Sequence, residues 1–219
     1  DEAGGDQARD VKVVVLLREP ISRELSWYNH LVHQLKRHDP PEYAYMVAKD
    51  VDKPGGPNAE VITFSRYVQE QTMALLVGPT ASYETATPPC HQDKYSEFPP
   101  CFGLYAHFLG EWFEWFGRNQ TLVLSYDELQ NNPSKMRWRL MKFLDLDPEK
   151  VRKVGFSTAN QQKSNLKVNK PGCQVTNLLR KVFEPKNEEL YRLLEKRPGM
   201  YMEERPFPKF TRPECVMDG

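Results

Sequence analysis

Hydrophobic residues along the chain follow two patterns, and each pattern predicts one kind of element. The apolar runs 13–17 and 121–125 are typical of buried β-strands, since a strand that is covered on both faces has no polar alternate positions. Apolar residues recur every three or four positions in 20–36, 59–76 and 103–116. That spacing predicts amphipathic helices with one face in the core.

Two helices carry further signals. The four-residue repeat in 103–116 consists of Leu104, Phe108, Trp112 and Phe116. This aromatic stripe predicts a core-facing surface rather than a ligand cage. Asn132 followed by Pro133 predicts the N-cap and first residue of another helix. The stripe expected to be buried in that helix consists of Met136, Leu140, Phe143 and Leu144.

The order of these elements predicts an α/β fold with a parallel β-sheet flanked by helices and joined by right-handed crossovers. The chain has 219 residues, enough for one sizeable domain. Residues 1–10 are polar and contain glycine, so we expect a flexible end or linker before a domain over 11–219. The segments 39–58 and 78–100 predict long irregular loops, of a length that is usually functional or disordered. The first residue is Asp, which predicts a fragment or a processed chain.

Composition excludes several classes of protein. Thirty basic and thirty acidic residues cancel, so the chain lacks the overall basic charge of a nucleic-acid-binding protein. Hydrophobic residues make up 39% of the chain, which argues against global disorder. No apolar stretch approaches the ~20 residues that a membrane-spanning helix requires.

The cysteines and one sequon bear on the compartment. The four cysteines lack the spacing of a zinc site. Cys90 and Cys101 bracket a proline-rich segment that a disulfide would staple in an oxidising compartment, although unpaired cysteines in a cytosolic protein fit the count as well. Asn119 begins an N-glycosylation sequon in an expected surface loop. Together these features favour the lumen of the secretory pathway.

The end of the first strand carries the chemistry. Arg18 follows the run 13–17, Pro20 opens the next helix, and Ser26 lies on that helix. Ligands of open α/β sheets bind outside the carboxyl ends of the strands. A guanidinium in that place, with a hydroxyl nearby, is suited to hold a phosphate. The alternative is an ordinary strand-to-helix turn with proline at the first helical position.

This segment resembles the 3′-phosphate-binding motif of sulfotransferases that use 3′-phosphoadenosine 5′-phosphosulfate (PAPS), in which an Arg and a Ser eight residues later bind the nucleotide. Further stretches match that family in order, namely 103–112, 122–129, 143–146 and 175–191. The set resembles in particular the Golgi carbohydrate sulfotransferases of the heparan-sulfate type. The resemblance covers roughly residues 11 to 194.

The resemblance implies a P-loop-NTPase-like sulfotransferase fold that is N-terminally incomplete in this chain, with a C-terminal helix pair over 175–191. It implies PAPS as co-substrate, no metal, and a 3′-phosphate site formed by Arg18 and Ser26. Lys163 and Lys167, with Lys170, lie where the family has a basic loop that closes over the nucleotide. The family's compact Lys-Gly-Arg triplet is missing, so a solvated run of charges is an equal alternative.

The catalytic residues are unknown in this chain, because the family's phosphosulfate loop, with its lysine and base, is expected upstream of Val11. Arg23 is interpreted as a solvated helix residue rather than a ligand. A nucleotide kinase is disfavoured because no Walker motif occurs.

The resemblance therefore implies a transferase that moves a sulfuryl group from PAPS to a hydroxyl or amine of a sugar or glycan acceptor. It implies a Golgi lumenal glycoprotein whose parent carries an N-terminal membrane anchor, with no nucleic acid as partner. The alternative is a catalytically inactive sulfotransferase-like module that binds an anionic glycan or nucleotide.

Overall fold

A computed structural model describes residues 11–38, 61–77, 99–116, 120–151, 170–196 and 207–217. The elements within them are β1 (Val13–Leu17), α1 (Pro20–His38), α2 (Phe64–Val77), the 3₁₀ helix η5 (Pro99–Gly103), α3 (Tyr105–Trp115), β2 (Thr121–Ser125), α4 (Tyr126–Asn131), α5 (Pro133–Phe143), α6 (Pro148–Val151) and α7 (Cys173–Lys196). The strands pair in parallel, with Val13 opposite Thr121 and Leu17 opposite Ser125. The α/β class and the parallel pairing are thus confirmed.

The chain divides into two compact units. One, here called the sheet unit, comprises residues 1–19, 104–160 and 184–212. The other, here called the helical unit, comprises residues 20–103, 161–183 and 213–219. The sheet unit holds both strands, whereas the helical unit holds α1, α2 and η5.

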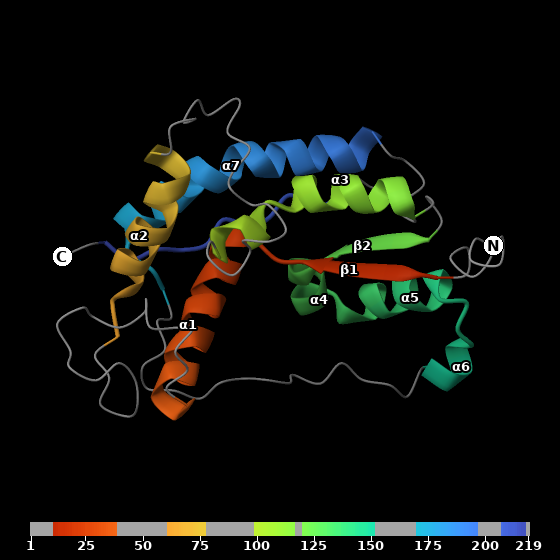
Figure 1. The fold of residues 1–219 in the computed structure, drawn as a ribbon. Helices are drawn as coiled ribbons and strands as arrows, with labels where there is room; N and C mark the ends of the chain where they lie inside the picture. Colours follow the sequence, from red (N-terminus) through yellow and green to blue (C-terminus); the bar gives the residue numbers. More distant parts are fainter. Residues whose placement is uncertain are drawn as a thin grey trace, which may run out of the picture. The chain divides into compact units, whose positions relative to one another are not determined.

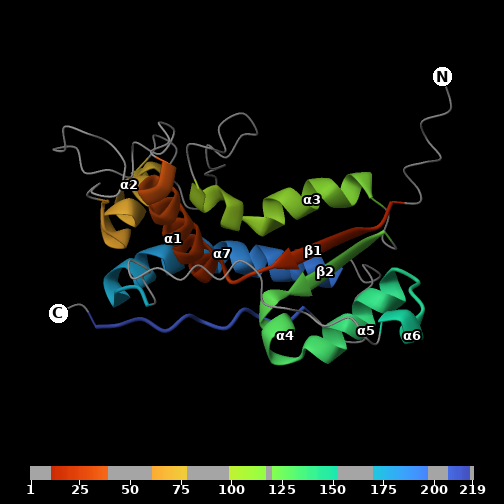
Figure 2. The ribbon, with the colours of Figure 1, turned by 90° about the horizontal axis from the view of Figure 1, so that it is seen from below.

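In the sheet unit, helices pack on both faces of the β1–β2 pair. Figures 1 and 2 show α3 on one side of the strands and α4 and α5 on the other. The core on the α3 side consists of Leu17, Leu109, Phe113, Val123, Leu190, Leu194 and Phe207. The core on the α5 side consists of Leu122, Leu124, Met136 and Phe143. The expected α5 stripe is confirmed, with Leu140 and Leu144 packed at its margin.

The prediction that residues 13–17 form a strand buried on both faces is wrong in its second half. All five residues of β2 are buried, but Val14 and Leu16 of β1 are 41% and 45% exposed. These two lie opposite Leu122 and Leu124 in the ladder. The core on that face is formed by β2 with α5, and within the described part of the chain it does not extend over β1.

The predicted core stripe of the aromatic helix is also wrong by one position. The buried residues of α3 are Leu109 and Phe113, whereas Trp112 is 47% and Trp115 84% exposed. The Trp112 ring instead stacks on the Phe116 ring, with centroids 5.5 Å apart. Both stripes are apolar with the same four-residue repeat, so the periodicity could not decide which one faces the strands.

Two helix boundaries differ from expectation. α2 begins at Phe64 rather than near residue 59, because Thr63 caps it by accepting a hydrogen bond from the Arg66 amide at 3.2 Å. The expected C-terminal helix pair is one helix, α7, that continues through Pro185. The expected flexible end at 1–10 and the loop at 39–58 lie outside the described residues.

The helical unit is organised around a buried carboxyl group. Glu24 of α1 is fully buried and accepts hydrogen bonds from the Tyr67 hydroxyl of α2 at 2.5 Å and from Arg23 at 2.6 Å. Burial raises the pKa of Glu24, and the neighbouring Arg23 charge and the two hydrogen bonds only partly oppose this. The Tyr28 hydroxyl also donates to the Ile62 carbonyl, so α2 and the residues before it are pinned to α1.

A disulfide that the sequence analysis did not assign joins Cys173 to Cys215, 42 residues apart. Cys101 is also disulfide-bonded and fully buried, whereas Cys90, its expected partner, lies outside the described residues. The part of the chain that the structure describes contains no helix long and apolar enough to span a membrane.

Candidate functional site

The candidate site lies at the carboxyl ends of the two strands. Arg18 directly follows β1 and Tyr126 directly follows β2. Because the strands are parallel, with Leu17 opposite Ser125, the next residue of each strand emerges at the same edge. The Arg18 guanidinium lies over the Tyr126 ring, 5.1 Å from its centroid. This cation–π contact orients the guanidinium at the sheet edge.

The backbone of Arg18 is held as well. The Tyr105 hydroxyl, from the first turn of α3, donates to the Arg18 carbonyl oxygen at 2.8 Å. Among the residues that the structure describes, no carboxylate pairs with the Arg18 guanidinium and no acceptor takes a hydrogen bond from it. A guanidinium carries five N–H donors in a fixed fork, so this half-buried side chain has its donors available for an anion.

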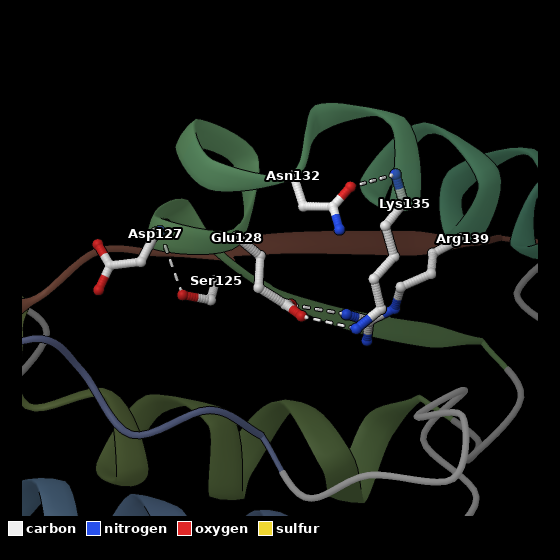
Figure 3. A network of polar contacts seen from close by, with 6 residues as sticks. All are labelled: Ser125, Asp127, Glu128, Asn132, Lys135 and Arg139. Carbon is white, nitrogen blue, oxygen red and sulfur yellow. Dashed lines mark hydrogen bonds and ion pairs between the residues drawn. The ribbon is translucent and has the colours of Figure 1, made fainter.

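A second cluster of charges, at the end of β2, is fully paired. Ser125 caps α4 by accepting a hydrogen bond from the Asp127 amide at 3.2 Å, and Figure 3 shows Glu128 reaching from α4 toward α5. The Glu128 carboxylate pairs with Arg139 at 2.8 Å and with Lys135 at 3.3 Å. These ion pairs join α4 to α5, so we assign them to stability rather than to ligand binding.

The Asn132 cap at the start of α5 confirms the sequence-based prediction. Its side-chain oxygen accepts a hydrogen bond from the Lys135 amide at 3.2 Å, and Pro133 follows in the first turn (Figure 3).

Acidic groups and a tyrosine border the site. Glu19, next to Arg18 in sequence, is only 6% exposed. Burial raises the pKa of Tyr191, and the negative charges of Glu188, Glu19 and Asp127 raise it further, against the opposing effect of a hydrogen bond from the Phe210 amide. Tyr191 is therefore a neutral phenol over the physiological pH range.

The predicted site residues have different outcomes. Arg18 occupies the predicted sheet edge. Ser26 lies on α1, in the helical unit, with an exposed side chain whose hydroxyl makes no hydrogen bond to any residue in the described part of the chain. Lys163, Lys167 and the glycosylation candidate Asn119 lie outside the described residues. Their proposed roles stay predictions.

Two further lysine and arginine predictions can be compared with contacts. Lys170 forms an ion pair with Glu214, and this hydrogen bond and charge lower the pKa of that carboxyl. Arg23 is not the solvated residue that was expected, because its side chain is only 21% exposed, pairs with Glu24 and lies over the Phe102 ring. Its position beside a buried carboxyl explains the difference.

The sequence analysis missed Tyr105 and Tyr126 as neighbours of Arg18. Tyr126 could have been found as the first residue after the second strand, the position equivalent to Arg18. Tyr105 carried no comparable signal, because it was indistinguishable from the other aromatic residues of its helix. The described residues contain no group of three or more His, Cys, Asp or Glu side chains that could hold a metal ion.

Comparison with known proteins bears on this site. One relative is the bifunctional heparan sulfate N-deacetylase/N-sulfotransferase 1 of Caenorhabditis briggsae, which is 27% identical over 137 residues, or 62% of this chain. The matched stretch spans only 12% of that relative's length. The family described as the sulfotransferase domain matches residues 7–181, a range that includes Arg18 and Tyr126. The chain therefore belongs to the sulfotransferase domain family.

Proposed function

We propose that this chain binds PAPS and serves the transfer of its sulfuryl group to a hydroxyl or amine of a carbohydrate. The observation that carries the proposal is the Arg18 guanidinium, which is oriented by Tyr126 and Tyr105 and has no anionic partner among the described residues. A 3′-phosphate accepts bidentate, charge-assisted hydrogen bonds from such a group. Ser26 is proposed to add one hydroxyl donor, and Lys163 and Lys167 to add positive charge.

The reaction exchanges one bond to sulfur for another. The acceptor oxygen or nitrogen attacks the sulfur, the bond between sulfur and the bridging phosphate oxygen breaks, and the acceptor proton passes to a base. Adenosine 3′,5′-bisphosphate leaves with the bridging oxygen. Within this scheme Arg18 binds and orients the nucleotide, so we place it in the binding machinery and not among the groups that transfer the proton.

The carbohydrate acceptor is proposed from the relative whose name includes heparan sulfate N-sulfotransferase. The test is an assay of sulfate transfer from ³⁵S-labelled PAPS to de-N-sulfated heparan sulfate and to a sugar chain without free amines. Transfer to either glycan supports the proposal, and the preferred glycan separates N- from O-sulfation. Binding of adenosine 3′,5′-bisphosphate without transfer to any glycan would instead favour a binding module.

Arg18→Lys sharpens the assay, because it keeps the charge but removes the bidentate fork. We expect the KM for PAPS to rise, whereas Arg66→Lys, at an exposed ion pair with Glu70 on α2, leaves it unchanged. An unchanged KM for PAPS in Arg18→Lys would contradict the assignment of Arg18.

We further propose that the protein acts in the Golgi lumen, on the basis of the Asn119 sequon and the disulfide-bonded cysteines. Protein expressed through the secretory pathway is expected to lose mass on treatment with an N-glycosidase, and Asn119→Gln to abolish that loss. A non-reducing peptide map is expected to link Cys90 to Cys101. Free thiols at both positions in secreted protein would contradict the second expectation.

A further inference from the structure

The C-terminal segment 207–212 contacts the sheet unit more extensively than a simple chain end requires. Phe207 is 5% exposed within the core that also contains Leu17 and Val123 of the two strands. The Phe210 ring packs at the margin of the same core. The segment thus belongs to the interior that supports the strands from which the candidate site extends.

One set of contacts leads from Phe210 to the backbone of Arg18. The Phe210 ring meets the Tyr105 ring edge-on, with centroids 6.1 Å apart. The Tyr105 hydroxyl donates to the Arg18 carbonyl at 2.8 Å. On its other side Phe210 is fixed by its amide, which donates to the Tyr191 hydroxyl at 2.9 Å. The position of Phe210 therefore bears on the position of the Arg18 main chain.

A second set of contacts leads from Thr211 to the guanidinium of Arg18. The Thr211 amide donates to the Asp127 carboxylate at 3.1 Å. Asp127 directly follows Tyr126, and its own amide is bound to Ser125, so the backbone on both sides of Tyr126 is tied down. The Tyr126 ring is the surface on which the Arg18 guanidinium lies. Neighbouring residues of one segment thus support Arg18 through its backbone and through its side chain.

We propose that the segment 207–212 is a positioning element for Arg18, and that it sets the affinity of the site for the 3′-phosphate without touching the nucleotide. This inference rests on the proposed function of Arg18. Its physical basis is preorganisation: a guanidinium that is held in place before binding loses less conformational freedom when the phosphate arrives. Phe210 and Thr211 act through Tyr105 and Asp127, so they are positioning residues and not ligands.

The test measures the binding of adenosine 3′,5′-bisphosphate by titration calorimetry. Phe210→Ala and Tyr105→Phe are each expected to weaken it about fivefold to tenfold, a range typical of coupling between contacting residues. Tyr105→Phe keeps the ring and its packing, so it remains informative if Phe210→Ala folds poorly. The matched control in the same segment is Arg212→Ala, which removes only an exposed ion pair with Glu184 and is expected to leave binding unchanged.

The same variants in an Arg18→Lys background decide whether the segment acts through Arg18. A positioning role predicts that Tyr105→Phe no longer weakens binding there, because the bidentate geometry that it supports is already lost. Wild-type affinity in both single variants, or an undiminished effect in the Arg18→Lys background, would overturn the proposal.

A measurement without nucleotide separates this inference from the proposed function. The Nε–Hε resonance of Arg18, assigned by its absence in Arg18→Lys, reports on the Tyr126 ring beneath the guanidinium. We expect it to shift or broaden in Phe210→Ala and Tyr105→Phe and to stay in place in Arg212→Ala. An unmoved resonance in the first two variants overturns the positioning role. Failure of the wild-type protein to bind the bisphosphate would overturn only the proposed function.

Discussion

Arg18 and Arg139 are two arginines of the sheet unit whose side chains are at least half-buried and whose surroundings differ in one respect. Arg139 pairs with Glu128 at 2.8 Å, and Lys135 pairs with the same carboxylate. Arg18 lies on an aromatic ring, with no anion among the described residues. Burying an arginine without an opposite charge is unfavourable unless a ligand supplies the charge. The difference identifies Arg139 as part of the fold and Arg18 as part of a site.

The largest expected effect is on ligand binding at Arg18. Arg18→Ala should weaken the binding of adenosine 3′,5′-bisphosphate by roughly 2–4 kcal/mol, since it removes a bidentate, charge-assisted contact. The free energy of unfolding should change by no more than about 0.5 kcal/mol, because no ion pair within the described residues is broken. Calorimetry and urea denaturation measure the two quantities. Equal affinity of variant and wild type would break the comparison.

Arg139→Ala should show the opposite behaviour. It leaves Glu128, whose side chain is 20% exposed, with only Lys135 as partner, so the free energy of unfolding should fall by about 2 kcal/mol. Nucleotide affinity should stay at the wild-type value. Lys135→Ala is the control in the same network, and its loss should be smaller because Lys135 is 45% exposed. A larger loss in Lys135→Ala would mean that burial does not rank these pairs.

Ser26→Ala should have a smaller effect on binding than Arg18→Ala. A neutral hydroxyl that donates to a phosphate contributes about 1 kcal/mol. The side chain is exposed on α1, so its removal should leave the urea midpoint unchanged. Ser22→Ala, one turn earlier on the same helix, is the comparison variant. If Ser26→Ala binds the bisphosphate as tightly as wild type, the site does not extend to α1.

The smallest and most indirect effect is on pH dependence in the helical unit, where Arg23 pairs with a fully buried carboxyl. Burial raises the pKa of Glu24 above its unfolded value of 4.5. The folded state therefore binds the proton more tightly, and its stability falls as the pH rises from 4.5 through the raised pKa. Glu24→Gln should remove this fall, because an amide does not ionise.

Urea midpoints for wild type and Glu24→Gln from acidic to neutral pH measure this effect. The difference between the two proteins should move in favour of the glutamine variant as the pH rises. A difference that is constant across this range would show that the ionisation of Glu24 is not linked to folding.

The contrast between Arg18 and Arg139 was only half visible in the sequence. Arg18 could be placed because a run of apolar residues ends at it and a proline starts a helix two residues later. The pairing of Arg139 with Glu128 could not, because it joins two helices separated by a turn. Similarly, Cys173 and Cys215 gave no sign that they are bonded, since disulfide connectivity cannot be deduced from the number of cysteines.

The sequence by itself determined the strands, most helices, their order and the residue that ends β1. Local patterns suffice for these, since a run of apolar residues and a helical repeat each depend on neighbours within a few positions. Only the tertiary structure decided which face of an apolar element is covered. Periodicity did not distinguish the buried Leu109 and Phe113 from the exposed Trp112, or the exposed Val14 and Leu16 from the buried residues of β2. Burial depends on which distant segments pack there, and so do the contacts of Tyr105 and Tyr126 that make Arg18 a site.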